Sequence, residues 1–238
     1  TGFDQTFRDP QGVQVGREYF GTVAVDAQGR SWVLVNGWQG TMYGQKHLYS
    51  IVKEFDPGTP DQPKAFVLDG WHDDLVLGLD GKLYASHWNA TDMVAGQSLN
   101  GNRVDYIDIV SPDGEHRQTQ AITEQNRCGS MVVDALGRVY AGNIVINPDG
   151  TVETLQIPSD SRIDWKAVGA DGSVYGLTPA RLLVLRPDRT YSHADDADIN
   201  GVDSFVFDLD GQIWFSNRDT MLTVRGVSQA QRDRTGDP

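Results

Sequence analysis

The sequence contains a single cysteine, Cys128, among its 238 residues. One cysteine excludes an intrachain disulfide, a thiolate metal cluster and a CxxC redox pair. Basic residues are also scarce, since 20 Lys and Arg stand against 33 Asp and Glu, for a net charge of −13. Nucleic acids and anionic membrane surfaces are bound through concentrated Lys and Arg, so neither is an expected partner.

Long apolar runs are missing too. No stretch approaches the length that a membrane span requires, so membrane insertion is not expected. The first residues read TGFDQTFRDP and have neither the basic start nor the apolar run of a signal peptide. The sequence leaves both a cytoplasmic and an exported location open.

Aromatic residues are plentiful, with six Trp, eight Tyr and eight Phe, and 39% of all residues are hydrophobic. A disordered acidic chain does not carry this much apolar material. The sequence therefore predicts a globular protein with a substantial core.

A thirteen-residue pattern occurs five times in the chain. Each copy has a short apolar run, a turn containing Asp and Gly, and a second run with an aromatic residue, which is the pattern of a β-hairpin. The copies start at residues 23, 75, 131, 166 and 205 and read VAVDAQGRSWVLV, LVLGLDGKLYASH, MVVDALGRVYAGN, KAVGADGSVYGLT and FVFDLDGQIWFSN. Most copies are followed by a second hairpin, so the repeating unit is a four-stranded sheet.

Repeated four-stranded units without helical periodicity predict an all-β chain, a β-propeller of four-stranded antiparallel blades. We expect five blades, or six if residues 1–20 hold a degenerate unit. The segment QTFRDPQGVQVG near the N-terminus is expected to complete the last blade and close the ring, which removes exposed sheet edges. The predicted domain covers residues 1–230, and residues 231–238 form a polar tail.

In a propeller, the residues just before each inner strand converge at the mouth of the central channel. Here they form a mixed set of acids, bases and aromatics, which favours a small-molecule site. The expected catalytic residues are His72, Asp73, Arg127 and Arg162. The expected ligand-binding residues are Tyr19, Trp71, Trp88, Trp165 and Cys128. The expected metal ligands are Glu18, Asp74, Asp164 and Asp203.

Each of these residues also has a structural interpretation. Asp at the start of a strand caps turns with its own side chain, and Arg pairs with Asp across a ring. His72 is suited to proton transfer near neutral pH but is also explained as a loop histidine. Cys128 lies beside Arg127, which favours a thiolate, although the sequence supplies no evident His partner. The turn sequences DLDG, GADG and NPDG lack the further acids of an EF-hand calcium loop, so hairpin geometry explains them better.

Two of the repeats, read with the residues before them as NRCGSMVVDALGRVYAGN and HDDLVLGLDGKLYASH, resemble repeats of known propellers. The families that they resemble are the gluconolactonase/regucalcin-like, the NHL-repeat and the virginiamycin-lyase-like propellers. The first resemblance implies one divalent cation in the channel and the opening of lactone rings by metal-activated water. Where those enzymes carry Asn-Asp before the third inner strand, this chain has Cys128-Gly129-Ser130. The ligand pattern of the family is therefore incomplete in this sequence.

These observations lead to three functional hypotheses. The first is a hydrolase of a lactone or ester that depends on one divalent cation (Ca, Mg, Mn or Zn). The second is a metal-free lyase or cyclase in the same channel, using His72 and the arginines. The third is a non-catalytic propeller that binds a glycan or a protein through loop aromatics such as Trp38 and Trp88.

Overall fold

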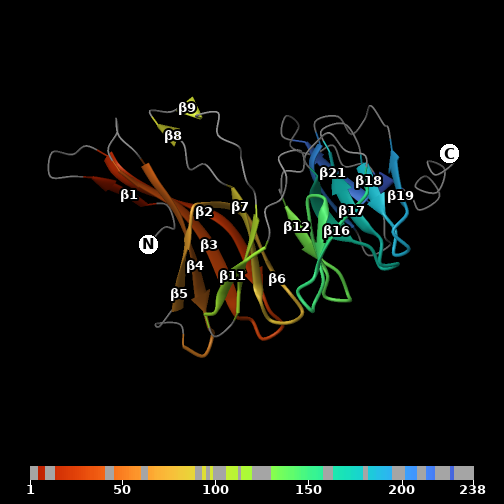
Figure 1. The fold of residues 1–238 in the computed structure, drawn as a ribbon, viewed down its shortest axis with the longest axis horizontal. Coiled ribbons are helices and arrows are strands. Elements are labelled where there is room, and N and C mark those ends of the chain that lie inside the picture. Colours follow the sequence, from red (N-terminus) through yellow and green to blue (C-terminus); the bar gives the residue numbers. More distant parts are fainter. Residues whose placement is uncertain are drawn as a thin grey trace. The chain divides into compact units, whose positions relative to one another are not determined.

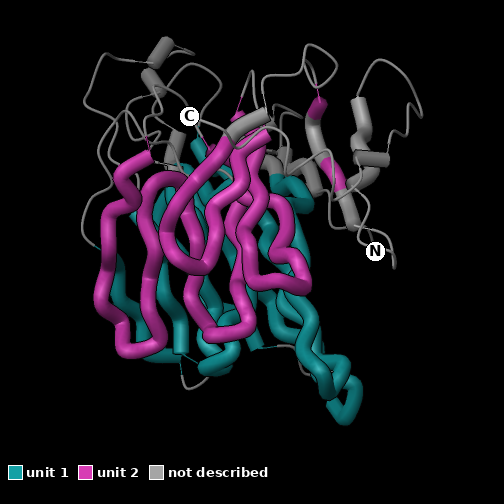
Figure 2. Tube along the Cα trace, turned by 90° about the vertical axis from the view of Figure 1, so that its right-hand side faces the viewer, with its two compact units in different colours: residues 1–124 teal, residues 125–238 magenta. Residues whose placement is uncertain are grey.

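A computed structural model shows an all-β chain, with no helix among the residues that it describes (Figure 1). The structure describes residues 5–8, 14–40, 46–59, 64–88, 93–94, 97–98, 106–111, 114–119, 130–157, 163–178, 182–194, 202–207, 213–217 and 226–227. Within these ranges no helix is long and apolar enough to cross a membrane. The chain divides into two compact units, Thr1–Glu124 and Gln125–Pro238, which Figure 2 shows in teal and magenta.

Unit 1 contains two larger antiparallel sheets and one small ribbon. The first sheet has the order β1-β2-β3-β4-β5, the second has the order β11-β10-β7-β6, and β8 pairs with β9. The strands are β1 (Gln5–Arg8), β2 (Gln14–Val25), β3 (Ser31–Gly40), β4 (Lys46–Phe55), β5 (Lys64–Asp69), β6 (Trp71–Leu77), β7 (Leu83–Trp88), β8 (Met93–Val94), β9 (Gln97–Ser98), β10 (Tyr106–Val110) and β11 (His116–Gln118).

Unit 2 contains three antiparallel sheets, each made of strands that are consecutive in the sequence. Their orders are β12-β13-β14-β15, β16-β17-β18-β19 and β20-β21-β22. The strands are β12 (Met131–Val133), β13 (Val139–Ala141), β14 (Ile144–Ile146), β15 (Val152–Thr154), β16 (Asp164–Val168), β17 (Val174–Leu177), β18 (Leu182–Leu185), β19 (Tyr191–Ala194), β20 (Val202–Phe207), β21 (Ile213–Asn217) and β22 (Gly226–Val227).

These sheets confirm the predicted repeating unit, in which two successive hairpins form four antiparallel strands. The predicted role of the N-terminal strand is wrong. Strand β1 pairs with β2 of the first sheet, from Gln5 opposite Glu18 to Arg8 opposite Gln14, whereas the described strands β20 to β22 pair with one another. A hairpin closes a short loop, and a short loop costs less chain entropy than joining segments from the two ends of the chain. The number of blades stays a prediction, as does the domain boundary at residue 230.

The hairpin turn between β12 and β13 is held by the carboxylate of Asp134. Its Oδ1 accepts the backbone N–H groups of Leu136 and Arg138, both at 2.9 Å. Its Oδ2 accepts the Arg138 Nε–H at 2.6 Å and the Tyr140 hydroxyl at 3.1 Å. Asp26 holds the turn between β2 and β3 in the same manner through its own backbone and arginine contacts.

The turn between β6 and β7 is also held by a carboxylate, but this carboxylate lies two residues later in the turn. Gly78 takes the place of the first Asp, and Asp80 supplies the oxygens: Oδ1 accepts the Lys82 N–H at 3.1 Å and Oδ2 accepts the Tyr84 hydroxyl at 3.0 Å. A Cβ atom on Gly78 would lie 2.5 Å from Asp80 Oδ1. In this turn the Asp80 carboxylate thus occupies the space that a side chain at residue 78 would enter, and it makes the hydrogen bonds that hold the hairpin, as the sequence predicts.

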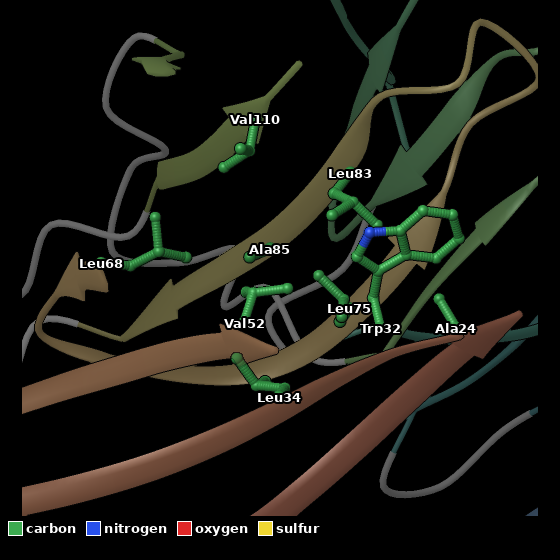
Figure 3. Packing of buried hydrophobic residues seen from close by; sticks show 9 residues of the cluster. All are labelled: Ala24, Trp32, Leu34, Val52, Leu68, Leu75, Leu83, Ala85 and Val110. Carbon is green, nitrogen blue, oxygen red and sulfur yellow. The ribbon is translucent and has the colours of Figure 1, made fainter. Parts of the chain in front are cut away.

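Each unit has its own apolar core. In unit 1 the two larger sheets pack face to face, and Figure 3 shows the Trp32 indole between Ala24 and Leu83. Leu34 and Val52 have no exposed surface, and each such buried side chain contributes about 1.5–3 kcal/mol to folding. The cluster consists of Ala24, Trp32, Leu34, Val52, Leu68, Leu75, Leu83, Ala85 and Val110. In unit 2 the core centres on Trp165, which is also fully buried.

Candidate functional site

The first residues of β6 form the most chemically varied edge of unit 1. Trp71 is opposite Trp88 and His72 is opposite His87, but the next pair is Asp74 with Ser86, so Asp73 is an extra residue in a β-bulge. A bulge bends its strand and redirects a side chain, and bulges are common beside active sites. Asp73 is exposed while His72, its neighbour, is fully buried. Strand β20 has the same kind of bulge at Asp203.

His72 lies in a buried hydrogen-bond network between the two sheets of unit 1. Its Nε2 is 2.6 Å from Asp108 Oδ2 on β10, and its Nδ1 is 2.9 Å from Ser50 Oγ on β4. Its backbone is held as well, because its N–H donates to Asn36 Oδ1 at 3.2 Å and its carbonyl accepts the Asn36 amide at 2.7 Å. Strand β6 is thus fixed to the neighbouring sheet at the residue before the bulge.

Asp108 continues this network outward to β11. Its Oδ1 accepts hydrogen bonds from His116 Nε2 at 2.5 Å and from the Gln118 amide at 2.9 Å. Burial raises the pKa of Asp108, but the hydrogen bonds and positive charge of His72, together with the bonds from His116 and Gln118, outweigh burial and hold the pKa below its ordinary value. An ionised carboxylate accepts hydrogen bonds and donates none, so both histidines present N–H groups to it.

Ser50, His72 and Asp108 resemble a nucleophile, base and acid in composition. Ser50 and His72 have no exposed surface, however, and Asp108 is only 1% exposed. A catalytic nucleophile must contact its substrate, whereas a buried and paired network ties strands together. In this conformation the trio therefore serves to fix β6, and the use of His72 as a base toward a small molecule stays a prediction.

A second histidine lies next to this network. His87 on β7 stacks on Tyr106 with ring centroids 3.9 Å apart, and its Nε2 is 3.0 Å from the Tyr106 hydroxyl. Burial, together with the nearby positive charge of His72, lowers the pKa of His87 to about 4. Gly70 is required beside it, because a Cβ at Gly70 would lie 2.2 Å from His87 Nε2 and the glycine has φ of 82°. His87 is therefore a neutral packing residue near pH 7.

Aromatic and acidic residues of β2 border the start of β6. The Tyr19 and Trp71 rings lie 5.8 Å apart, and both side chains are partly exposed. Glu18 is 8% exposed and accepts the Tyr49 hydroxyl at 3.3 Å. Burial and the charge of Glu18 raise the pKa of Tyr49. We call the group Glu18, Tyr19, Trp71, Asp73 and Asp74 the strand-start edge of unit 1.

The expected metal site does not gain support from this edge. Within the described ranges, no three His, Cys, Asp or Glu side chains are grouped so that they could hold a metal ion. Glu18 and Asp74 belong to unit 1, whereas Asp164 belongs to unit 2, and the Asp203 side chain lies outside the described residues. The described donor set does not fit a cation, so we derive no chemical step through one.

In unit 2 the corresponding strand starts are tied to each other. Asp164 Oδ1 accepts the Ser130 N–H at 3.4 Å, and Lys166 Nζ donates to Ser130 Oγ at 2.7 Å. Trp165, expected to bind ligand, is fully buried and donates its indole N–H to the Gly142 carbonyl at 2.7 Å. Three other expected site residues, Arg127, Cys128 and Arg162, lie outside the described residues, as does the Trp88 side chain.

Comparison with known proteins gives matches in structure only, since no family model and no curated protein matches the sequence. A catalytically inactive virginiamycin B lyase from Staphylococcus aureus with quinupristin aligns with a TM-score of 0.56 at 11% identity, over 94% of this chain and 87% of that one. PorZ, a surface component of the type-IX secretion system of Porphyromonas gingivalis, aligns with a TM-score of 0.55 at 10% identity, over 84% of this chain and 31% of that one.

A gluconolactonase from Xanthomonas campestris aligns with a TM-score of 0.47 at 11% identity, over 91% of this chain and 92% of that one. No functional argument rests on this weaker likeness. At such identities a match speaks for the fold and not for the activity. The matches at TM-scores above 0.5, together with the repeated antiparallel sheets, show that the chain has the β-propeller fold predicted from its repeats.

Proposed function

We propose that the protein is an enzyme that opens a cyclic ester by elimination, with the strand-start edge of unit 1 as its acting surface. The observation that carries the proposal is the bulge at Asp73, which presents an exposed carboxylate next to Trp71 on a strand anchored by the buried His72 network. An anchored strand holds a reacting group in one geometry, which is what catalysis requires of it.

The residues of this edge fit the needs of an elimination. A base removes a proton from carbon while a carboxylate leaves the neighbouring carbon, so neither added water nor a metal is required. Asp73 is assigned as the base, since an exposed carboxylate can reach a bound substrate. The Tyr19 and Trp71 rings supply apolar surface for the ring or side chains of the substrate.

Elimination is the first candidate because the exposed Asp73 carboxylate supplies the base that this reaction needs. The metal-dependent hydrolysis of a lactone remains the second candidate for the same substrate class. The two reactions leave different products, since hydrolysis adds one water to the ring-opened product and elimination leaves the mass unchanged and creates a double bond.

The test uses quinupristin and glucono-1,5-lactone as probes, with products separated and weighed by mass spectrometry. We expect quinupristin to give a ring-opened product of unchanged mass, formed equally well in the presence of EDTA. Glucono-1,5-lactone has no acidified C–H next to the carbon that carries its ring oxygen, so its opening reports hydrolysis. Replacing the base, Asp73→Asn, is expected to slow turnover by roughly 10²-fold or more. The matched control is Asp69→Asn, which removes the same charge from the exposed end of β5.

The outcomes separate the alternatives. A product heavier by one water, lost with EDTA, replaces elimination by metal-dependent hydrolysis. Equal rates for Asp73→Asn and the wild type refute the assignment of the base. Failure to open quinupristin, with both proteins folded by circular dichroism, refutes the proposal for this substrate class.

A non-catalytic binding role is a third candidate, favoured by the partly exposed Tyr19–Trp71 pair. Aromatic pairs of this kind bind the flat faces of sugars and other ligands. A glycan array followed by titration of the strongest hit tests it, and Trp71→Ala is expected to weaken that binding at least tenfold. An unchanged affinity would count against this role.

A further inference from the structure

A pocket of 390 Å³ opens at the opposite ends of the same strands in unit 1. Strand β6 runs from Trp71 at the strand-start edge to Leu77, which lines this pocket together with the turns after β2 and β6. Its floor is apolar and is formed by Trp32, Phe66, Leu77 and Leu83. Figure 3 shows that the Trp32 indole and Leu83 lie side by side in this region. We call this cavity the turn-end pocket; its volume lies within the range of small-molecule sites.

The charged residues of the turn-end pocket are arranged in two layers. The acids lie behind, since the side chains of Asp26 and Glu54 are only 8% and 10% exposed. The cations lie in front of them: the Arg30 side chain is 41% exposed and the Lys64 side chain is 70% exposed. Arg30 binds Asp26 closely at 2.7 Å, whereas Lys64 is 3.8 Å from Glu54. A solute entering the pocket therefore meets positive charge first, although the whole chain carries a net charge of −13.

Unit 2 has an ion pair at the place in its sheets that corresponds to the turn-end pocket of unit 1. The outer turn of β18 and β19 has Arg189, and its Nη2 donates to Glu153 on β15 at 3.1 Å. The matching turn of unit 1 follows β10 and has Gly114 at this position. The two residues are equivalent because the Arg189 N–H donates to the Arg186 carbonyl and the Gly114 N–H donates to the Ser111 carbonyl.

The partner of Arg189 is also exchanged in unit 1. In unit 1, Trp32 pairs with Glu54 on the next strand, and Glu54 pairs with Lys64 on the strand after that. In unit 2, Tyr140 pairs with Val145 and Val145 with Glu153 in the same way. Lys64 and Glu153 therefore hold equivalent positions in their sheets. The acid of unit 2 is thus replaced by a base, and the arginine that bound it is replaced by a glycine without a side chain.

We propose that the turn-end pocket binds a small aromatic carboxylate. Gly114, where unit 2 has Arg189, lies against the Phe66 ring, and the exchange of Glu153 for Lys64 reverses the charge that an occupant must carry. The Arg30 guanidinium lies over the Trp32 ring, so an aromatic ring is placed against the partly exposed Phe66 and the outer side of Arg30, with its carboxylate toward Lys64. This site is separate from the strand-start edge and does not depend on the proposed elimination.

The experiment is a calorimetric titration of the full chain with three probes of one shape: phenylacetate, phenylacetamide and 2-phenylethylamine. We expect phenylacetate to bind best and to bind more weakly as salt is added, because exposed ion pairs are screened. Lys64→Met is expected to weaken phenylacetate roughly three- to fivefold, the size of an exposed ion pair. Lys64→Glu, which copies Glu153, is expected to favour the amine over the carboxylate.

The matched control is Lys53→Met, since Lys53 lies on β4 next to Glu54 and does not line the pocket. It removes the same charge and is expected to leave phenylacetate binding unchanged. Three results would overturn the proposal: the absence of saturable phenylacetate binding, equal affinities for the three probes, or equal effects of Lys64→Met and Lys53→Met. Urea unfolding of each variant confirms that the comparison is made between folded proteins.

Discussion

His87 makes the protein sensitive to mild acid. Its side chain is 3% exposed and stacked on Tyr106, and its pKa is about 4 because burial, and then the charge of His72, disfavours the imidazolium, with Asp108 and Asp69 opposing only in part. The unfolded chain takes up a proton near the ordinary pKa of about 6.5, but the folded chain does not. The stability that His87 contributes is therefore complete above about pH 6.5 and is lost as the pH falls toward about 4.

The size of this loss follows from the two pKa values. A pH of 5 is about 1.5 units below the ordinary pKa of histidine and still above the pKa of His87 in the folded protein. Protonation therefore stabilises the unfolded state by about 2 kcal/mol relative to the folded state. The carboxylates with lowered pKa, such as Asp26 and Asp149, lose their contribution at lower pH, below about 4. Between pH 7 and pH 5 the effect of His87 can thus be measured separately from theirs.

The assay is urea unfolding at pH 7, 6 and 5, followed by tryptophan fluorescence, for the wild type and His87→Gln. Gln at residue 87 keeps an acceptor for the Tyr106 hydroxyl but does not titrate. We expect the wild type to lose about 2 kcal/mol more than His87→Gln between pH 7 and pH 5. Equal losses in the wild type and His87→Gln would refute the reasoning.

Three further changes test the turns. Asp134→Ala leaves two turn N–H groups and a buried tyrosine hydroxyl without their acceptor, so it should lower the free energy of unfolding by about 2–3 kcal/mol in urea titrations. Gly78→Asp alone should lower the free energy of unfolding by about 1–3 kcal/mol, because the new side chain meets the Asp80 carboxylate. Adding Asp80→Gln copies the first repeat and should recover most of this loss. If the double variant recovers nothing, the exchange of carboxylate positions is refuted. Arg189→Gly should change the free energy of unfolding by less than about 1 kcal/mol, because glycine relieves the strain of the φ of 72° and this offsets the lost ion pair with Glu153. A larger loss would show that the ion pair contributes more stability than the strain costs.

The hairpins could be predicted from sequence because their turns depend on local chemistry. Gly29, Gly81, Gly137 and Gly172 all have φ between 77° and 81°, a conformation that favours glycine, so the turn is visible in one short stretch of letters. Strand β1 shows the limit of this approach. Its sequence resembles an outer strand, but nothing local tells which sheet it joins.

The surroundings of His72 could not be predicted for a different reason. Its partners Ser50 and Asp108 lie 22 and 36 residues away on other strands, and no short motif links them. Regular alternation would also set Asp73 and Asp74 on opposite faces of β6, but the bulge breaks that alternation. The sequence therefore drew attention to this stretch of chain, and only the fold separates its buried histidine from its exposed carboxylate.

The exchange of carboxylate position in the turns also bears on how the chain arose. The first and third repeats carry Asp first, as in DAQG and DALG, and the second and fourth carry Gly first and Asp third, as in GLDG and GADG. In the second repeat a Cβ on Gly78 would lie 2.5 Å from Asp80 Oδ1, so an acid at the first position requires the Asp80 side chain to move. Duplication of a pair of repeats produces this alternation directly, whereas duplication of single repeats would require the same double exchange to occur more than once. The fifth repeat, DLDG, carries both acids, so the five repeats contain three forms of the same turn.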